Sequence, residues 1–189
     1  MKNKKLLILA LAGIPWIILT GMVVNAYLPI LTGRSYLLPV KARDPRDFFR
    51  GNYVALEYDF SSVRFDAIRH DLVAGKDYRF GDILYLAFRE QGGALALTGL
   101  YAESKPDSAI VLKVQPEHSF RLEDKDASLA TGLESFFAPK ADALAWEDAL
   151  REGRVFARVS IDHSGNARLR ELVLAEAKAA RTADAEADE

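Results

Sequence analysis

One arrangement of residues in the sequence could support catalysis. A serine follows an apolar segment directly, and lysines occur further along the chain. A membrane-tethered Ser/Lys peptidase needs a serine beside a desolvated lysine that acts as the base. Ser35 supplies the serine, and Lys41, Lys105 and Lys113 are the available lysines. Ser35 lies in no supporting motif, and Lys113 alternates with apolar residues as an exposed strand position does. We expect solvated side chains, and a membrane-tethered hydrolase of unrecognised type is the alternative.

Metal and acid–base chemistry have little support in the spacing of the residues. His70, His118 and His163 have neither the i, i+4 nor the i, i+2 spacing of a preformed metal site. The chain contains no cysteine, which excludes disulfides and thiolate ligands. Glu57 and Asp59 share one face of a predicted strand, about 7 Å apart, but a solvated face is the commoner setting. We therefore predict no catalytic residue, no metal and no cofactor.

The composition describes one ordinary domain with appendages. The chain has 189 residues, of which 50% are hydrophobic, and many of the apolar residues lie in the first thirty positions. The formal net charge is −2, so there is no basic field that would attract a phosphate backbone. Nucleic acid is therefore not an expected partner.

Residues 1–33 predict a cytoplasmic lysine cluster and a single transmembrane anchor. Lysines lie at positions 2, 4 and 5, and no further charge occurs before Arg34. This uncharged run exceeds the roughly 20 residues that cross about 30 Å of hydrocarbon. The basic start predicts a cytoplasmic N-terminus and an extracytoplasmic C-terminal domain. The alternative is a signal peptide cleaved near Ala26.

Residues 34–175 alternate between apolar and polar side chains and predict a mainly β domain with α+β character at its margins. We expect an antiparallel β-sandwich or partial barrel with one or two short helices. The pattern predicts roughly eight strands, among them two hairpins. The predicted hairpins pair Ile83–Arg89 with Ala94–Glu103 and Arg154–Asp162 with Ala167–Leu174.

Five further segments have a more specific expectation. Pro39 and Pro45 argue for an edge position or a bulge in the first strand and the turn after it. Residues 61–75 read as a short helix or a long ordered loop, and residues 141–153 as a helix. Phe136 and Phe137 are expected to be apolar anchors of a strand. Residues 176–189 form an acidic, alanine-rich tail that we expect to be frayed or disordered.

The segment GNYVALEY, Gly51–Tyr58, resembles the signature of the bacterial GDYXXLXY family. Gly51, Tyr53, Leu56 and Tyr58 match the signature, and Asn52 replaces its aspartate. The preceding DPRDFFRG is similar to the family's lead-in, and GLESFFAP with WEDALREGRVFARVSID is similar to its second region. The resemblance runs from the anchor to about Leu174.

The resemblance implies a location and an architecture, but no catalytic residues. It implies a single-pass protein of the bacterial cytoplasmic (inner) membrane, and some family members lie beside or are fused to multi-span membrane proteins. We therefore expect a non-catalytic module that docks onto an integral membrane or envelope partner, which the sequence does not name. The candidate binding residues lie in the motif and its lead-in: Arg46, Asp47, Arg50, Gly51, Asn52, Tyr53, Leu56 and Tyr58.

Asn52 favours a structural role for the start of the motif. Asparagine would replace an aspartate poorly if that aspartate bound a metal or moved a proton. It replaces aspartate well in a turn, because both residues cap turns and tolerate a left-handed backbone. Val54, Leu56 and Tyr58 share one face of the strand, which we expect to enter the core.

Overall fold

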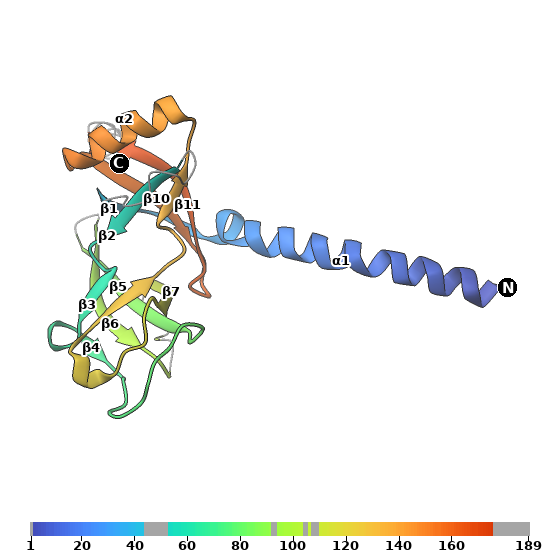
Figure 1. Cartoon of the computed structure of the whole chain (residues 1–189), viewed down its shortest axis with the longest axis horizontal. Coiled ribbons are helices and arrows are strands. Elements are labelled where there is room, and N and C mark those ends of the chain that lie inside the picture. The colour runs from blue at the N-terminus through green and yellow to red at the C-terminus, as the bar shows by residue number, and fades with distance from the viewer. Residues whose placement is uncertain (1, 44–52, 92–93, 104–105, 107–109, 176–189) are drawn as a thin grey trace, which may run out of the picture.

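A long helix projects from a β-rich body in the computed structural model of the chain (Figure 1). The structure describes residues 2–43, 53–91, 94–103, 106 and 110–175. The helix is α1 (Lys2–Thr32), and the body contains two curled, mostly antiparallel sheets that together approach a barrel. This is the predicted fold class. The described residues form eleven strands, more than the eight expected. β3 (Ser62–Arg64) and β4 (Arg69–His70) are too short to show a pattern, and β9 (Ser135–Phe137) is separate from the strand before it, with which it was expected to be continuous.

The first sheet has five strands in the order β11-β10-β1-β2-β9. Every neighbouring pair in this sheet is antiparallel. Its longer strands are β1 (Arg34–Ala42), β2 (Tyr53–Tyr58), β10 (Val155–Ile161) and β11 (Ala167–Leu174). Since β1 follows α1 almost directly, this sheet carries the connection between helix and body.

The second sheet has six strands in the order β3-β8-β7-β5-β6-β4. Its longer strands are β5 (Leu84–Gln91), β6 (Ala94–Tyr101), β7 (Ile110–Pro116) and β8 (Asp126–Ala130). All its pairs are antiparallel except β4 with β6. Two short 3₁₀ helices, η1 (Phe65–Ala67) and η2 (Leu122–Asp124), complete this half of the body.

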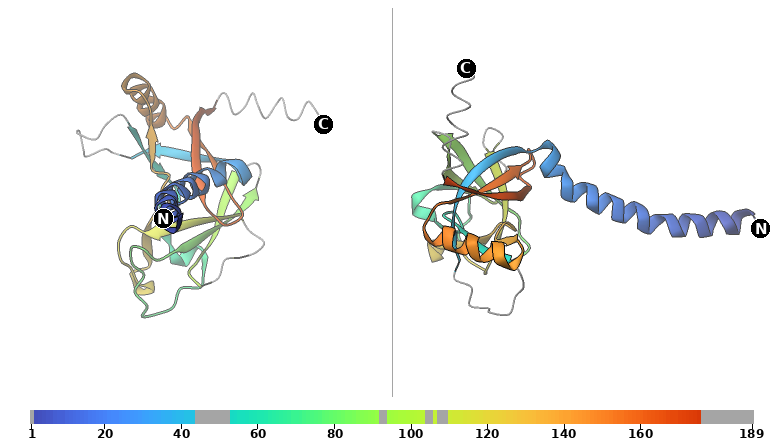
Figure 2. Two further views of the ribbon diagram at one scale, coloured as in Figure 1. Left: turned by 90° about the vertical axis from the view of Figure 1, so that its right-hand side faces the viewer. Right: turned by 90° about the horizontal axis from the view of Figure 1, so that it is seen from above.

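Both predicted hairpins are present. β5 pairs with β6 from Tyr85 opposite Tyr101 to Gln91 opposite Ala94. β10 pairs with β11 from Val155 opposite Leu174 to Ile161 opposite Ala167. The predicted helix at residues 141–153 is α2 (Lys140–Arg151), which packs on β1 and β2 and is seen from above in Figure 2. Alternation and turn residues were therefore sufficient to predict these elements.

The prediction of an edge strand at Pro39 is wrong, because β1 lies in the middle of its sheet. β1 pairs with β10 from Arg34 to Pro39 and with β2 from Val40 to Ala42. Pro39 therefore stands where one partner ends and before the other begins. Each half of β1 is paired along one side only, and this gives a residue without an amide hydrogen the same freedom as an edge position.

Residues 61–75 form an ordered loop with short strands, and no α-helix. The segment contains β3, the single 3₁₀ turn η1 and the two-residue β4. The residues that indicated a helical stripe were Val63, Ile68 and Leu72; Val63 and Leu72 are buried and Ile68 packs against the core, although the segment is no α-helix. The predicted disordered tail, residues 176–189, and Pro45 lie outside the described residues.

One hydrophobic core fills the space between the sheets. Val54, Leu56 and Tyr58 of β2 are buried in it, as their alternation predicts. The other sheet contributes fully buried side chains from its central strands, among them Leu86, Leu100 and Leu112. The core thus places the motif strand against the second sheet, and its burial is a large part of the driving force for folding.

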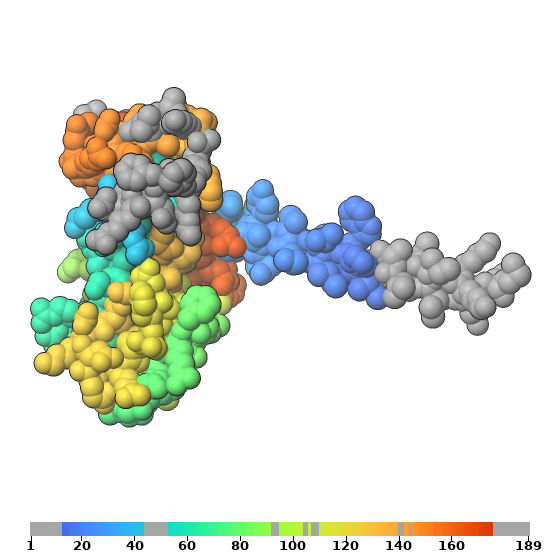
Figure 3. Space-filling view, viewed as in Figure 1, coloured from blue at the N-terminus to red at the C-terminus, as the bar shows by residue number. Residues whose placement is uncertain are grey.

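The helix α1 stands clear of the body over most of its length (Figure 3). Its length is about 45 Å at 1.5 Å per residue. Gly13–Thr32 is long and apolar enough to cross a membrane, and only 6% of it is buried. In the described residues, α1 contacts β10 and β11 of the body. Side chains such as Trp16 and Leu31 are exposed, as expected of a helix whose surroundings are lipid.

Candidate functional site

The two motif regions, far apart in the sequence, are neighbouring strands. β2 pairs with β9 so that Tyr53 lies opposite Phe137 and Val54 lies opposite Phe136. The pairing continues past β9, where the amide of Leu56 donates to the carbonyl of Glu134 at 2.8 Å. One ladder of hydrogen bonds therefore joins GNYVALEY to GLESFFAP, and this local contact explains why both segments occur together.

Tyr58 closes this ladder from inside the core. Its ring is buried, and its hydroxyl donates to the carbonyl oxygen of Leu133 at 3.1 Å. Burial raises the pKa of the Tyr58 phenol, and the nearby Glu134 carboxylate raises it further. The phenol is therefore a neutral donor at physiological pH, and its role here is to bind a buried carbonyl rather than to transfer a proton.

The opposite face of the same strands carries aromatic rings to the surface. The ring centroids of Tyr53 and Phe137 are 6.0 Å apart. Phe137 is 78% exposed, so the expectation that it is an apolar anchor of the core is wrong. Phe136 meets the prediction, since it packs edge-on against Trp146 of α2. We call Tyr53, Phe137 and the outer edge of β9 the motif edge.

The motif edge is also the last strand of its sheet. In the described part of the chain, β9 pairs with β2 on one side and with no strand on the other. An unpaired edge offers backbone amides and carbonyls to another extended segment. The arrangement suits peptide binding by strand addition, with aromatic side chains to select the partner.

A polar cavity of about 260 Å³ lies beside the motif strand. It is lined by Arg43, Glu57, Glu117 and Glu134, together with several serines. Arg43 forms an ion pair with Glu117 at 3.0 Å, and Glu134 accepts hydrogen bonds from Thr131. The described residues contain no group of three side chains arranged to hold a metal ion. The cavity thus contains one ion pair and one hydrogen-bonded carboxylate.

The proposed Ser/Lys arrangement is not assembled in the described residues. Lys41 binds Asp59 at 2.7 Å, and Lys113 donates to the side-chain oxygen of Asn166 at 2.9 Å. Ser35 lies opposite Ser160 in the β1–β10 register. Lys105 lies outside the described residues. Lys113 is half-buried rather than fully solvated, which corrects the expectation for that strand position.

Five of the candidate binding residues fall outside the described residues: Arg46, Asp47, Arg50, Gly51 and Asn52. Their role in a turn or in binding stays a prediction. The flanking Arg43 and Tyr53 show that this segment joins the far ends of β1 and β2. Tyr53, which follows this segment directly, belongs to the motif edge.

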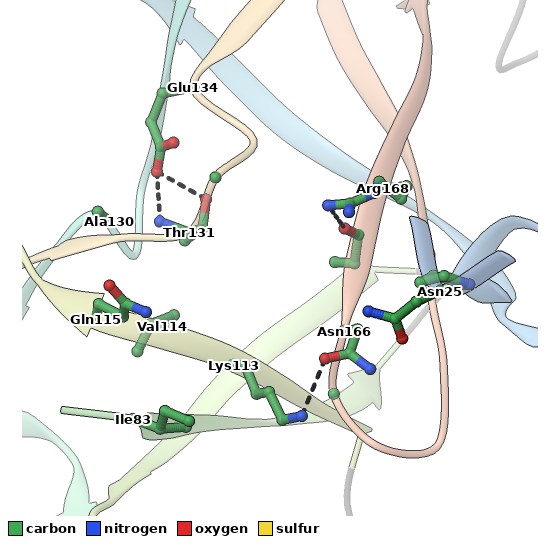
Figure 4. A pocket seen from close by; sticks show the side chains of 14 residues that line it. Asn25, Ile83, Lys113, Val114, Gln115, Ala130, Thr131, Glu134, Asn166 and Arg168 are labelled. Atoms are coloured by element: carbon green, nitrogen blue, oxygen red, sulfur yellow. Dashed lines mark hydrogen bonds between the residues drawn. The ribbon is translucent and has the colours of Figure 1, made fainter. Parts of the chain in front are cut away.

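A second cavity, of about 440 Å³, lies where α1 meets the body (Figure 4). Its polar side chains come from four distant segments of the chain: Asn25, Lys113, Gln115, Thr131, Glu134, Asn166 and Arg168. The sequence gives no spacing that would connect these residues, because β7 of one sheet lies beside the β10–β11 hairpin of the other only in the folded chain, where the amide of Lys113 donates to the carbonyl of Gly165 at 2.8 Å. We call this the anchor cavity.

The turn that shapes the anchor cavity is held by a buried carboxylate. Asp162 accepts hydrogen bonds from the amides of Ser164 and Asn166 and from the side chain of Asn166. Burial alone would raise the pKa of Asp162, but these hydrogen bonds outweigh burial and lower it. The ionised Asp162 therefore fixes Asn166 in the position from which it accepts from Lys113.

Comparison with protein families gives a match over residues 15–172, which includes both motif regions and most of the anchor. The chain belongs to the GDYXXLXY family. Comparisons with curated proteins and with solved structures each found no match. In this GDYXXLXY protein the leucine and the second tyrosine of the signature, Leu56 and Tyr58, are core residues. The first tyrosine of the signature, Tyr53, is partly exposed.

Family membership and α1 together indicate a membrane-anchored domain. The family has no assigned function, so its name adds no chemistry. The same helix length and position would also suit a signal sequence. What distinguishes the two experimentally is whether residues 1–33 remain in the mature protein.

Proposed function

We propose that this protein is a non-catalytic module, anchored in the bacterial inner membrane, that docks onto an extracytoplasmic segment of an integral membrane protein. The observation that carries the proposal is the motif edge. There the ring of Phe137, which is 78% exposed, lies on β9, whose outer side pairs with no strand in the described residues. On its other side β9 pairs with β2, which contains most of the segment that gives the family its name. Exposed aromatic residues at a free sheet edge are typical of surfaces that bind another chain.

The anchor supports this placement. Lys2, Lys4 and Lys5 precede an uncharged helix, so the positive-inside rule favours a cytoplasmic N-terminus. The body, residues 34–175, is then extracytoplasmic as one domain. A reporter that is active only in the cytoplasm, fused at the C-terminus, should be silent. N-terminal sequencing of the mature protein should give Met1 or Lys2 rather than a residue near Tyr27.

The motif edge stands away from the membrane in this orientation. β1 leaves the end of α1 and runs about 30 Å at 3.3 Å per residue, as Figure 2 shows from above. Tyr53 lies beyond Ala42, at the far end of β1. The partner must therefore present a loop or domain that rises above the membrane surface, and we propose an extended segment that adds to β9.

Site-specific photo-crosslinking in cells tests the docking surface. Benzoyl-phenylalanine replaces Phe137 in the full chain, and the same replacement at Phe80 is the matched control. Both residues are phenylalanines with 78% exposure, and Phe80 lies outside both motif regions. We expect the probe at 137, but not at 80, to form an adduct with an integral membrane protein.

Two further observations on the adduct test whether it forms at the motif edge. Mass spectrometry should place the crosslink in an extracytoplasmic segment of the partner, and Tyr53→Ser should reduce its yield because it removes the neighbouring ring. An adduct from both probe positions, or from neither, would contradict a docking role for the motif edge.

A further inference from the structure

The anchor cavity lies at the depth of the lipid headgroups if α1 is retained as the anchor. About 20 helical residues cross the hydrocarbon core of a membrane. Counted from the end of the lysine cluster at Lys5, such a stretch ends at Asn25, the first polar residue after the cluster apart from Thr20. Asn25 lines the cavity, as does Pro29 one turn later. The cavity therefore opens at the level where phosphate groups of the outer leaflet lie.

Two positive charges in the cavity have neutral partners only. Lys113 donates to the amide oxygen of Asn166 at 2.9 Å, and Arg168 donates to the carbonyl of Ala26 at 3.2 Å. Neither forms an ion pair within the described part of the chain. The one carboxylate that lines the cavity, Glu134, is turned to Thr131, from which it accepts two hydrogen bonds. Figure 4 shows Glu134 on the side opposite Lys113 and Arg168.

This arrangement differs from that of several cations elsewhere on the surface. Many cations of the body have carboxylate partners, among them Lys41 with Asp59, Arg43 with Glu117 and Arg121 with Asp77. Around the end of α1, by contrast, Arg34 and Arg170 are also without an ion pair in the described residues, and Arg170 donates to a carbonyl of the helix. The surface that faces the membrane thus carries uncompensated positive charge, which attracts anionic lipids.

The remaining lining suits a lipid rather than a fully polar ligand. Asn25, Gln115 and Thr131 add neutral hydrogen-bonding groups, and Ile83 adds an apolar side chain that is half exposed. On the membrane side the cavity continues onto α1, whose exposed Met22 and Val23 form an apolar surface for acyl chains. A volume of about 440 Å³ is within the range of small-molecule sites.

We propose that the anchor cavity binds the phosphate headgroup of an anionic phospholipid, with Lys113 and Arg168 on the phosphate and the acyl chains along α1. The proposal rests on α1 being a retained anchor, and it does not depend on docking at the motif edge. The bound lipid would fix the height and rotation of the domain above the membrane.

Photo-crosslinking in nanodiscs tests the lipid. The full chain is placed in phosphatidylcholine nanodiscs that contain photoactivatable phosphatidylglycerol or, in a parallel sample, photoactivatable phosphatidylcholine. We expect phosphatidylglycerol to label peptides of α1, β7 and β11 in preference. The double variant Lys113→Gln, Arg168→Gln should lower this preference by about fivefold or more, the effect of one cation at a membrane surface.

The matched control removes two charges elsewhere. Arg69→Gln with Arg89→Gln, on exposed positions of β4 and β5, should leave the preference unchanged. Equal labelling by the two lipids, or an equal loss in both double variants, would overturn the proposal. If the cavity variant does not fold, as judged by thermal unfolding, the wild-type preference must still fall when salt is raised from 0.1 to about 0.5 M.

Two further measurements distinguish lipid binding from binding of a soluble phosphate and from the docking function. Inorganic phosphate or glycerol phosphate, added to the nanodiscs, should not abolish labelling, and full competition at millimolar concentration would assign the cavity to a soluble phosphate instead. Mass spectrometry of the mature protein shows whether residues 1–33 are present. Loss of the crosslink from position 137 with lipid labelling intact would reject the docking function alone.

Discussion

The hydroxyl of Ser160 donates to the carbonyl oxygen of Pro29 at 2.8 Å, which joins the middle of the body to the end of the anchor. Ser160 is fully buried on β10, and the same carbonyl also accepts the amide of Gly33 at 3.0 Å. Arg168 and Arg170 of β11 donate to the carbonyls of Ala26 and Ile30. The carbonyl of Ile30 is among the last four of the helix, which lack helical partners, so β11 caps α1 there, and the other bonds join the end of α1 to the sheet.

Ser160→Ala should loosen this joint without unfolding the body. The loss of one buried hydrogen bond costs about 1 kcal/mol, and Pro29 keeps its bond from Gly33. Thermal unfolding of the full chain in detergent should show the loss. The same substitution in residues 34–175 should cost less, because Pro29 is absent there. An equal loss in both proteins would mean that Ser160 acts within the sheet alone.

Gly33→Ala should disturb the joint more strongly. A Cβ at Gly33 would clash with the carbonyl oxygen of Pro29 and lie 2.8 Å from the backbone carbonyl of Ile161. Both are backbone atoms that cannot rotate away, so we expect a cost of about 1–3 kcal/mol and faster proteolysis near residue 33. Gly21→Ala is the control, since nothing lies within 4 Å of its Cβ. Equal behaviour of the two variants would show that α1 does not rest on the body.

The elements that the sequence predicts correctly are those with a long, regular pattern of apolar and polar residues. The hairpins β5–β6 and β10–β11 have long alternating strands and turn residues between them, and the uncharged run of α1 is unambiguous in length. The short strands β3, β4 and β9 were not separable, since two or three residues show no period. Pro39 misled because it lies at a change of partner inside the sheet, which local sequence does not reveal.

The residues of the candidate sites also differ in whether local sequence predicts their position. Leu56 and Tyr58 were assigned to the core from alternation, and their burial confirms it. Phe137 was not recognised as a surface residue, because an aromatic in a strand is more often buried. The anchor cavity was out of reach, since Lys113 and Arg168 meet only through the packing of two sheets. Lys113 does have one local signal, a cation between buried valines at 111 and 114.

Leu56→Ala should destabilise the domain by about 2–5 kcal/mol, the cost of truncating a buried leucine. Leu56 is fully buried at the centre of the ladder between the motif regions, whereas the adjacent Glu57 is exposed. Glu57→Ala is therefore the matched control and should stay within about 0.5 kcal/mol of wild type. Denaturant unfolding of residues 34–175 measures both. A Leu56 variant that melts with wild type would reject the core assignment.

Arg50→Ala separates the structural from the binding interpretation of the motif. Arg50 lies outside the described residues, so its role stays a prediction. If the segment before Tyr53 binds the partner, Arg50→Ala should keep the wild-type unfolding temperature and lose the crosslink from position 137. If the segment only shapes a turn, Arg50→Ala should keep the crosslink, and Asn52→Asp should be neutral in both measurements.

Tyr58→Phe should reveal a loss of stability at alkaline pH that belongs to one phenol. The folded-state pKa of Tyr58 is raised by burial, whereas in the unfolded chain it titrates near 10. Below that pH both states keep the proton. Above it the unfolded state releases a proton that the folded state retains, so the free energy of unfolding falls by about 1.4 kcal/mol per pH unit.

The comparison between wild type and Tyr58→Phe isolates this effect from other alkaline titrations. Near neutral pH the wild type should be more stable by about 1–3 kcal/mol, because Phe leaves the buried carbonyl of Leu133 without its donor. Above about pH 10 only the wild type loses stability through the ionisation of Tyr58 in its unfolded state. The difference in the free energy of unfolding between the two proteins should therefore shrink by about 1.4 kcal/mol per pH unit. Denaturant midpoints at several pH values measure it. A difference that stays constant up to about pH 11 would show that Tyr58 ionises as readily in the folded protein as in the unfolded chain, and the core position of this motif residue would then be wrong.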